Sequence, residues 1–304
     1  MLELDFAFFN MRSCNRQGLA NRKSILDRLA PLLFSPRVER LIHFGRLGLK
    51  GCNLNLPLGE GNWSILNHDN RDLMLARTSA ILEDYALPRM AVDRRLKNIF
   101  TAEEHHLSLV FGDYFLSVLA AVLIDQTVSR HEIKRLVLLG DIPHLWPLLQ
   151  TVSSHQIPIS LQNFCPKEYE IMVHRLLYEE GLAVSNSCIN PHSWEKGDLV
   201  LSVGPQQARI RLAAPHIFHI RLDDECSGAA PELEQVLQEA GLEPQMYNLA
   251  PILESCLWAQ AGKSVHGGES NYLDTEFMLP DVYREMIETG HYLGMWEPFL
   301  DKAG

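Results

Sequence analysis

Three residues near the middle of the chain carry groups that can transfer a proton. Asp113 offers a carboxylate and Tyr114 a phenol, directly after the apolar stretch 107–111, which we predict to be a strand. Lys97 precedes them, and its ammonium group and Asp113 could face one cleft between two domains. General acid–base catalysis needs such groups within hydrogen-bond reach of the substrate. We therefore take Asp113, Tyr114 and Lys97 as candidate catalytic residues, with an ordinary helix N-cap as the alternative role for Asp113.

Six further residues stand at or just after the ends of predicted strands. Ligands of open α/β sheets bind outside the carboxyl ends of the strands, and a glycine there lets the backbone approach the ligand closely. Asp141 can also cap the helix that follows it, which would put its negative charge where a phosphate would bind. A plain turn is the alternative for Gly204. The candidate cofactor-binding residues are Gly140, Asp141, Ile142, Asn163, Ser202 and Gly204.

Cysteine and histidine spacing gives no metal signal. The six cysteines contain no C-x-x-C pair, which fits reduced thiols better than a disulfide framework or a structural zinc site. His216 and His219 lie three apart on a predicted strand, where they would point to opposite faces. We therefore expect no bound metal.

From residue 106 onward, the sequence alternates regularly between predicted strands and predicted helices, and these elements must hold the candidate residues. Short apolar runs alternate with helix-length amphipathic stretches, which is typical of parallel βαβ units. We predict strands at 134–140, 157–161, 181–185, 198–203 and 217–220, and helices at 114–129, 143–155 and 166–180. The sequence thus predicts an α/β protein whose residues 106–230 form a Rossmann-like, doubly wound parallel sheet.

The rest of the chain is less regular. Residues 1–105 are predicted to form a smaller α/β domain of substrate-binding type, and the C-terminal helices of segment 245–304 are expected to join it. Its strands are expected at 4–9 and 40–44 and its helices at 22–33 and 71–83; helices are also expected at 231–240, 249–261 and 280–290.

Charge and composition exclude several classes of partner. The 304 residues include 27 Lys and Arg against 38 Asp and Glu, so a net charge of -11 disfavours nucleic acid and anionic membranes. The N-terminus carries acids where a secretory signal carries bases, and the apolar run 114–124 is shorter than the ~20 residues of a spanning helix. We expect a cytoplasmic protein with a small-molecule ligand, and we consider a homodimer.

Several segments carry a resemblance to a known family. They are the stretch 35–58 with its closing Leu-Pro-Leu, the turns 111–114 and 139–146, the helix segment Leu253-Glu254-Ser255 and the closing segment 288–298. In order and spacing they resemble the shikimate-dehydrogenase-like group, which includes the long-chain acyl-carrier-protein reductases. The resemblance implies that NAD or NADP binds next to Gly140 and Gly204. It also implies hydride transfer to a carbonyl or acyl substrate.

The departures from the family pattern concern its chemistry. Pro143 and Trp146 occupy the places of two family glycines, and an indole there would push helix and strand apart unless the loop is rebuilt. Pro251 stands where the reductases carry their acyl-binding cysteine, and Cys256 lies on the wrong side of the motif, where we expect a buried thiol. The leading hypothesis is a degenerate oxidoreductase-like protein. The alternatives are a non-catalytic Rossmann-fold protein that binds a small ligand or a partner, and an α/β enzyme that uses another nucleotide.

Overall fold

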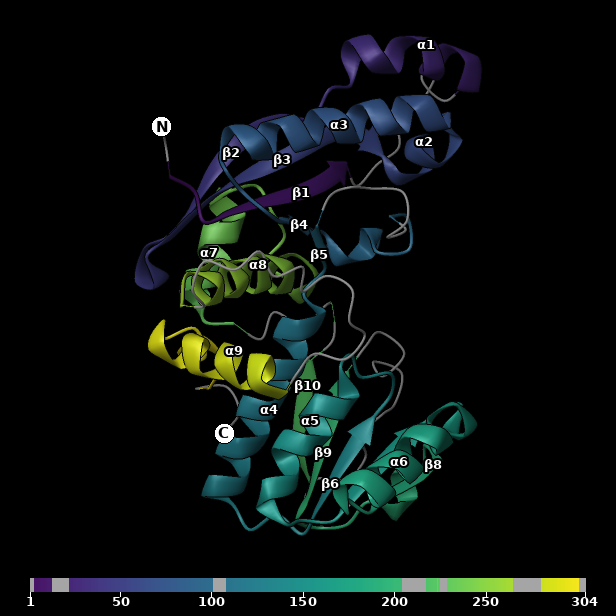
Figure 1. Ribbon diagram of the computed structural model, residues 1–304, viewed down its shortest axis with the longest axis vertical. Helices are drawn as coiled ribbons and strands as arrows, with labels where there is room; N and C mark the ends of the chain where they lie inside the picture. The colour runs from purple at the N-terminus through teal and green to yellow at the C-terminus, as the bar shows by residue number, and fades with distance from the viewer. Residues whose placement is uncertain are drawn as a thin grey trace. The chain divides into compact units, whose positions relative to one another are not determined.

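The chain divides into two compact units. The computed structural model describes residues 3–12, 22–100, 108–203, 217–222, 224, 229–264 and 280–300. Unit 1 comprises residues 1–112 and 231–273, and unit 2 comprises residues 113–230 and 274–304 (Figure 1). Each unit contains a five-stranded sheet. Of the C-terminal segment that we expected to join residues 1–105, the helix Met246–Ser264 belongs to unit 1, and the helices Pro280–Tyr292 and Glu297–Leu300 belong to unit 2.

Unit 1 is a mixed sheet with helices on both faces. Its strands lie in the order β2-β3-β1-β4-β5, and all neighbours are parallel except the antiparallel pair β2 and β3. The strands are β1 (Phe6–Arg12), β2 (Arg37–Phe44), β3 (Leu49–Gly59), β4 (Met90–Val92) and β5 (Leu109–Val110). The helices are α1 (Lys23–Leu33), α2 (Glu60–Ile65), α3 (His68–Asp84), α7 (Pro231–Glu239) and α8 (Met246–Ser264), with 3-10 helices at Gly45–Leu47 and Arg94–Leu96.

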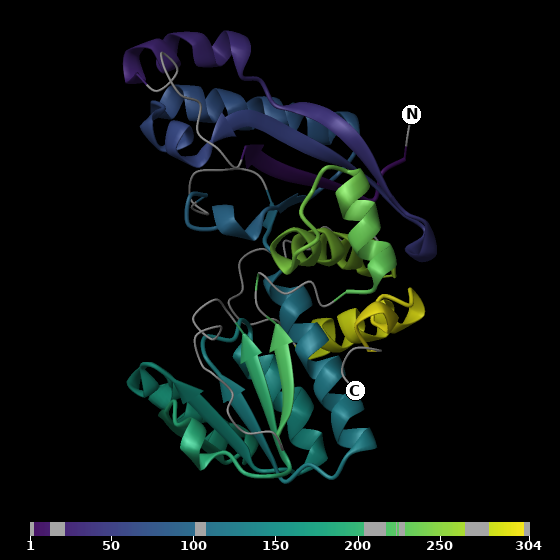
Figure 2. The same ribbon diagram turned by 180° about the vertical axis from the view of Figure 1, so that it is seen from behind.

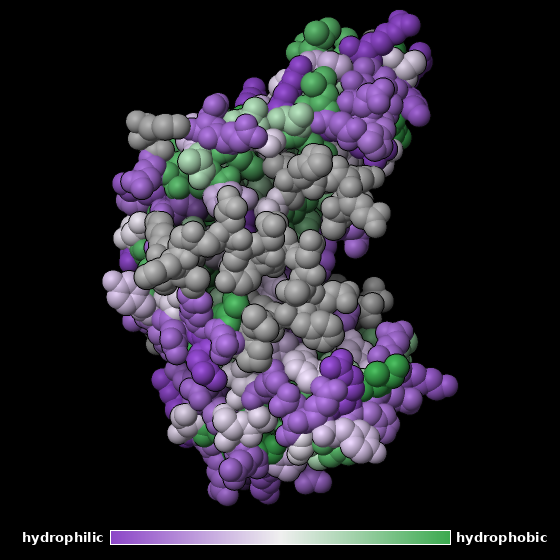
Figure 3. Space-filling model, in the orientation of Figure 1, coloured by the Kyte–Doolittle hydropathy of each residue, from purple (hydrophilic) through white to green (hydrophobic). Residues whose placement is uncertain are grey.

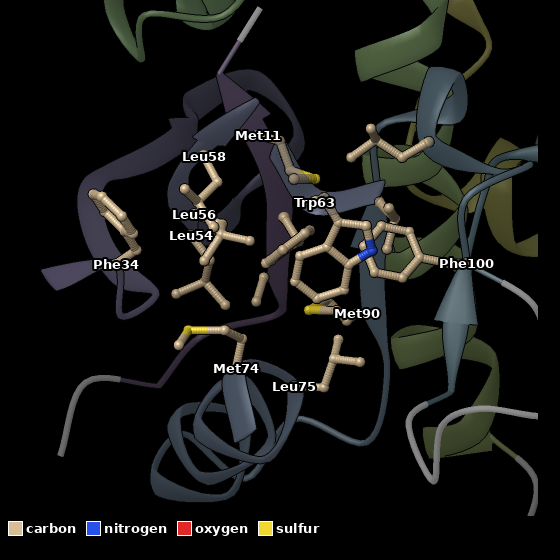
Figure 4. Packing of buried hydrophobic residues seen from close by; sticks show 14 of the residues in the cluster. Met11, Phe34, Leu54, Leu56, Leu58, Trp63, Met74, Leu75, Met90 and Phe100 are labelled. Carbon is tan, nitrogen blue, oxygen red and sulfur yellow. The ribbon is translucent and has the colours of Figure 1, made fainter. Parts of the chain in front are cut away.

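The main core of unit 1 lies between this sheet and α1, α2 and α3. Alternate residues of β3, from Cys52 to Leu58, point into it because successive strand side chains face opposite sides of the sheet. Figure 4 shows the indole of Trp63 beside the ring of Phe100, with 5.6 Å between the ring centroids. The opposite face of the sheet is contacted by α8, which packs on β1, β4 and β5.

Unit 2 confirms the predicted Rossmann-like sheet. Its five strands lie in the order β10-β9-β6-β7-β8, and every neighbouring pair is parallel. They are β6 (Arg135–Leu139), β7 (Ile159–Asn163), β8 (Val184–Cys188), β9 (Asp198–Val203) and β10 (Phe218–Leu222). The helices are α4 (Asp113–Arg130), α5 (Leu145–Val152), α6 (Glu170–Glu180), α9 (Pro280–Tyr292) and α10 (Glu297–Leu300), with 3-10 helices at Ser153–His155, Pro166–Tyr169 and Pro191–Ser193. Figures 1 and 2 show α4 and α5 on the same face of this sheet.

One predicted strand belongs to a different sheet from the one we expected. We expected the stretch 107–111 to be the first strand of the Rossmann-like sheet, but β5 pairs with β4 in unit 1, through Met90 with Leu109 and Ala91 with Val110. Gly112, with φ of +83°, ends this segment, and α4 begins at the next residue. The Rossmann-like sheet therefore begins with β6.

The connection from β8 to β9 crosses the sheet with only one short 3-10 helix. Trp194 in this connection is buried and packs on Val137, Leu139 and Val200 of β6 and β9. Its indole N–H donates to Oε1 of Gln162 at 3.1 Å. Trp194, together with Ile189 of the same connection, thus covers apolar sheet surface that a crossover helix commonly covers in this type of fold.

Candidate functional site

The strand order of unit 2 places a switch point between β6 and β9. The chain proceeds from β6 outward to β7 and β8, and then returns to β9 and β10 on the other side of β6. In open parallel sheets, ligands bind in the crevice at the carboxyl ends of the strands where the order reverses in this way. Leu139 and Ser202 are register partners at this edge. In the view of Figure 3, polar residues predominate on the described surface of unit 2.

Gly140 forms the turn directly after β6. Its φ of +88° is a left-handed conformation that glycine adopts without steric cost, and its N–H donates to the carbonyl of Gln162 at 3.0 Å. The strand is thus paired up to its last residue and then turns sharply. The turn predicted at this glycine is confirmed, and its role in cofactor binding stays a prediction.

The side chain of Asp141 has a different hydrogen-bond partner from the one we expected. The N-cap residue of α5 is His144, which makes no side-chain cap hydrogen bond, so Asp141 does not cap this helix. Instead, the exposed Asp141 accepts a hydrogen bond at 2.7 Å from the hydroxyl of Tyr169, which follows β7. Burial raises the pKa of Tyr169, and the bond to Asp141 raises it further, so the phenol keeps its proton and remains a donor. The two side chains connect the loops after β6 and β7.

The loop 140–147 does not fit a dinucleotide pyrophosphate. Such a group is bound by backbone N–H donors at the start of the helix, and Pro143 and Pro147 have none. Ile142 is buried, and the Asp141 carboxylate adds a negative charge to the loop. The centroid of the half-buried Trp146 ring lies 5.1 Å from the guanidinium carbon of Arg175 on α6.

Asn163 lies beside Gly140 at the same edge. Leu139 pairs with Gln162, so the next residues along β6 and β7 are neighbours as well. The Asn163 side chain is buried, with a residue exposure of 3%, and its Nδ2 donates to Oδ1 of Asn186 at 3.4 Å. Its own Oδ1 has no hydrogen-bond partner. Gln162, by contrast, is held in the sheet because its Oε1 accepts from both Asn190 N and Trp194 Nε1.

Ser202, near the end of β9, forms a pair that sequence reasoning missed. Its Oγ lies 2.8 Å from Nε2 of His219 on β10. We had considered His219 only as a metal ligand, and the signal for this pairing is the register of two parallel strands, which cannot be obtained from either strand alone. Gly204, the neighbouring candidate, and His216 lie outside the described residues.

The candidate catalytic residues lie in different units. Asp113 and Tyr114 form the first turn of α4 in unit 2, and the Tyr114 ring stacks on His144 with 3.5 Å between centroids and 10° between planes. His144 is left-handed, with φ of +51°, which is uncommon for a residue other than glycine. Lys97 is exposed in unit 1, after the 3-10 helix Arg94–Leu96. The pairing of Lys97 with Asp113 therefore stays a prediction.

Two described cysteines are buried in unit 1. Burial raises the pKa of Cys52 to about 11. It also raises that of Cys256, with Asp5 adding to the effect, and this residue is fully buried as we expected. Neither thiol is poised as a nucleophile, because the thiolate is the reactive form. Within the described ranges no group of three or more His, Cys, Asp or Glu side chains could hold a metal ion.

No described helix is both long and apolar enough to span a membrane.

The basic run that includes Arg94 and Arg95 makes structural contacts within unit 1. Arg94 donates to the carbonyl of Phe111 at 2.7 Å, and Arg95 pairs with the buried carboxylate of Asp93 at 2.6 Å. The Arg95 guanidinium carbon also lies 3.9 Å from the centroid of the Tyr247 ring.

Comparisons with known proteins add little beyond the fold. No protein-family model and no curated protein matches the sequence. Two solved structures align with the chain over most of its length. The L-tryptophan dehydrogenase from Nostoc punctiforme is 8% identical, with 99% of this chain and 88% of that chain covered and a TM-score of 0.39. A chorismate mutase/shikimate 5-dehydrogenase fusion protein from Clostridium acetobutylicum is 12% identical, with 98% and 99% covered and a TM-score of 0.33.

Likeness at this level carries no argument about activity. The fold class rests on the strand order of unit 2 itself. Neither of these two structures is described as an acyl-carrier-protein reductase, so that part of the family resemblance stays a prediction.

Proposed function

We propose that the protein binds a small organic ligand at the carboxyl edge of the unit 2 sheet, between β6 and β9. The observation that carries this proposal is the strand order β10-β9-β6-β7-β8, with Gly140 left-handed directly after the central strand. Edges of this kind are where parallel sheets bind ligands. The unpartnered Oδ1 of Asn163 supports the same location, because this acceptor lies beside Gly140 at the carboxyl ends of the strands and has no donor within the described protein.

NAD- or NADP-dependent hydride transfer to a carbonyl or acyl substrate is the second candidate. It is favoured by Asp113 and Tyr114, which give unit 2 a carboxylate and a phenol at the start of α4, with Tyr114 against His144 of the same ligand-binding loop. It ranks second because the loop 140–147 offers poor support for a pyrophosphate. Aldehyde-dependent oxidation of NADH or NADPH by the purified protein, lost in Tyr114→Phe, would raise it above the first.

Thermal unfolding in the presence of single compounds tests the first candidate. The panel contains adenosine, S-adenosylmethionine, ATP, NADH and NADPH. A true ligand at a hundredfold excess over its Kd stabilises the folded protein by about 2.7 kcal/mol. We expect at least one compound to raise Tm, and no effect from any of them would contradict the proposal.

Two matched variants locate the effect. Asn163 in unit 2 and Asn53 in unit 1 are both buried asparagines with an unpartnered Oδ1. We expect Asn163→Ala to reduce the ligand-induced rise in Tm at least severalfold and Asn53→Ala to leave it unchanged. An equal loss in both variants would place the site elsewhere.

A further inference from the structure

We infer that the ligand of this edge carries no phosphate and presents hydroxyl or amine donors to the loop. The inference rests on the proposed function and names the chemical class that the site accepts. It follows from which hydrogen-bonding groups the residues at the ends of β6 and β7 offer and which they lack.

Two side chains at the ends of β6 and β7 offer acceptors. The Asp141 carboxylate is exposed, and the bond from Tyr169 uses Oδ1 alone, whereas a carboxylate can accept about four hydrogen bonds. On the neighbouring strand, Oδ1 of Asn163 is a second acceptor, buried and without a donor. Acceptors of this kind are satisfied by hydroxyl or ammonium groups. A phosphate at neutral pH is itself chiefly an acceptor and cannot satisfy them.

The groups that bind phosphate are missing from the same loop. Residues 140–147 contain no lysine or arginine, and the first turn of α5 places Pro147 where a backbone N–H would be. Pro143 removes another donor from the approach to the helix. A helix N-terminus attracts anions through its N–H groups and dipole, so losing donors and adding the charge of Asp141 both weaken that attraction.

The Tyr169–Asp141 contact strengthens the argument. It links the loop after β6 to the loop after β7, which is the region where this type of fold holds the ribose and phosphates of a dinucleotide. Because Tyr169 keeps its proton, it stays a donor to Oδ1, and the exposed carboxylate keeps further acceptor capacity for a ligand donor. The preferred ligand class is therefore a polyol, a nucleoside or an amine.

Calorimetric titration with two matched compounds tests the inference. Adenosine and ADP share the base and the 2′- and 3′-hydroxyls, and ADP carries a diphosphate in place of the 5′-hydroxyl proton. We expect adenosine to bind the wild-type protein at least tenfold more tightly than ADP. Asp141→Asn keeps an acceptor for Tyr169. It should reduce the ratio of the Kd for ADP to the Kd for adenosine about tenfold, because one charge that repels the phosphates is removed. Glu132→Gln also removes one negative charge, but it does so before β6, at the amino edge of the sheet. It should leave the ratio of the two Kd values unchanged.

Pyrophosphate alone gives an independent readout. Wild-type amide resonances of residues 140–146 should not move with millimolar pyrophosphate, whereas Asp141→Asn combined with Pro147→Ala should bind it, because a charge is removed and a donor restored. Saturable shifts in the wild-type loop, or ADP binding at least as tightly as adenosine, would overturn the inference and leave the proposed site standing. No binding of any compound in the panel by the wild-type protein would contradict the proposed function, and the inference with it.

Discussion

A side chain at Gly112 in unit 1 would overlap the backbone of a neighbouring helix. A Cβ built on it would lie 2.7 Å from the backbone of Ala250 and Pro251 in α8, and its φ is +83°. Gly48 has a similar φ of +66° but nothing within 4 Å of such a Cβ. Substitutions at the two positions therefore distinguish the effect of backbone strain alone from the effect of strain combined with steric overlap.

Alanine at these two positions should destabilise the protein to different extents. We expect Gly48→Ala to lower the free energy of unfolding by about 1 kcal/mol through backbone strain alone. Gly112→Ala should lower it by about 3–4 kcal/mol, because overlap with α8 is added. Urea unfolding followed by circular dichroism measures both. Equal losses in the two variants would mean that α8 does not pack against this turn.

The buried thiol of Cys52 makes a pH-dependent contribution to stability. Its pKa rises from 9.0 to about 11 on folding, so the unfolded chain loses this proton first as the pH increases. The contribution is fully present below pH 9 and is lost between pH 9 and about 11, at about 1.4 kcal/mol per pH unit. Cys52→Ala should remove this slope from the free energy of unfolding. Cys165→Ala, which removes an exposed thiol, should keep it; a wild-type slope in Cys52→Ala would refute this assignment.

Single residues were predictable where local chemistry decides their role. A glycine after an apolar run predicted the turn at Gly140, and the burial of Cys256 followed from its residue type. The Asp141–Tyr169 hydrogen bond was not predictable, because it depends on the loops after two strands lying side by side. The same reason applies to Ser202 and His219, which meet only through the register of β9 and β10.

At the scale of elements, α4, α5 and α9 of unit 2 meet at one buried hydroxyl. The Tyr283 hydroxyl on α9 donates to the carbonyl of Ser117 at 2.7 Å and lies 3.1 Å from its Oγ, and Ser117 Oγ in turn lies 3.4 Å from the carbonyl of His144. Burial raises the pKa of Tyr283, so the phenol stays protonated at neutral pH.

Removing this hydroxyl should cost stability without changing the helix. We expect Tyr283→Phe to lower the free energy of unfolding by about 1–2 kcal/mol, because a buried hydrogen bond is lost and its acceptors remain. Tyr292 lies on the same helix with 91% of its surface exposed, so Tyr292→Phe should change it by less than about 0.5 kcal/mol. Chemical denaturation of the two variants in parallel provides the comparison, and equal effects would argue against the contact.

Periodicity predicted the type of most elements but not their partners. The helix expected at 114–129 is α4, and the strand expected at 198–203 is β9. Of the strand expected at 107–111, residues Leu109–Val110 form β5, yet β5 belongs to the other sheet. Hydrophobic patterning indicates which residues are buried and not which strand they pair with. Strand β8 begins at Val184, three residues later than expected, because Gly181 ends α6 in a left-handed conformation.

At the scale of the whole molecule, chain order does not follow the division into units. Residues 231–273 return to unit 1 after the Rossmann-like sheet is complete, and residues 274–304 belong to unit 2. Composition and patterning predict the α/β class, since both depend on local sequence. They cannot predict which unit a C-terminal helix joins, because that depends on which apolar surface is left uncovered elsewhere.

The most direct test of the ligand site is amide hydrogen exchange of the whole protein with and without saturating adenosine. We predict slower exchange at residues 140–145 and 163–169, where the loops after β6 and β7 meet, and unchanged exchange in the sheet of unit 1. Protection confined to unit 1 would contradict a ligand site at the carboxyl edge of the unit 2 sheet, and no saturable protection anywhere would contradict adenosine as its ligand.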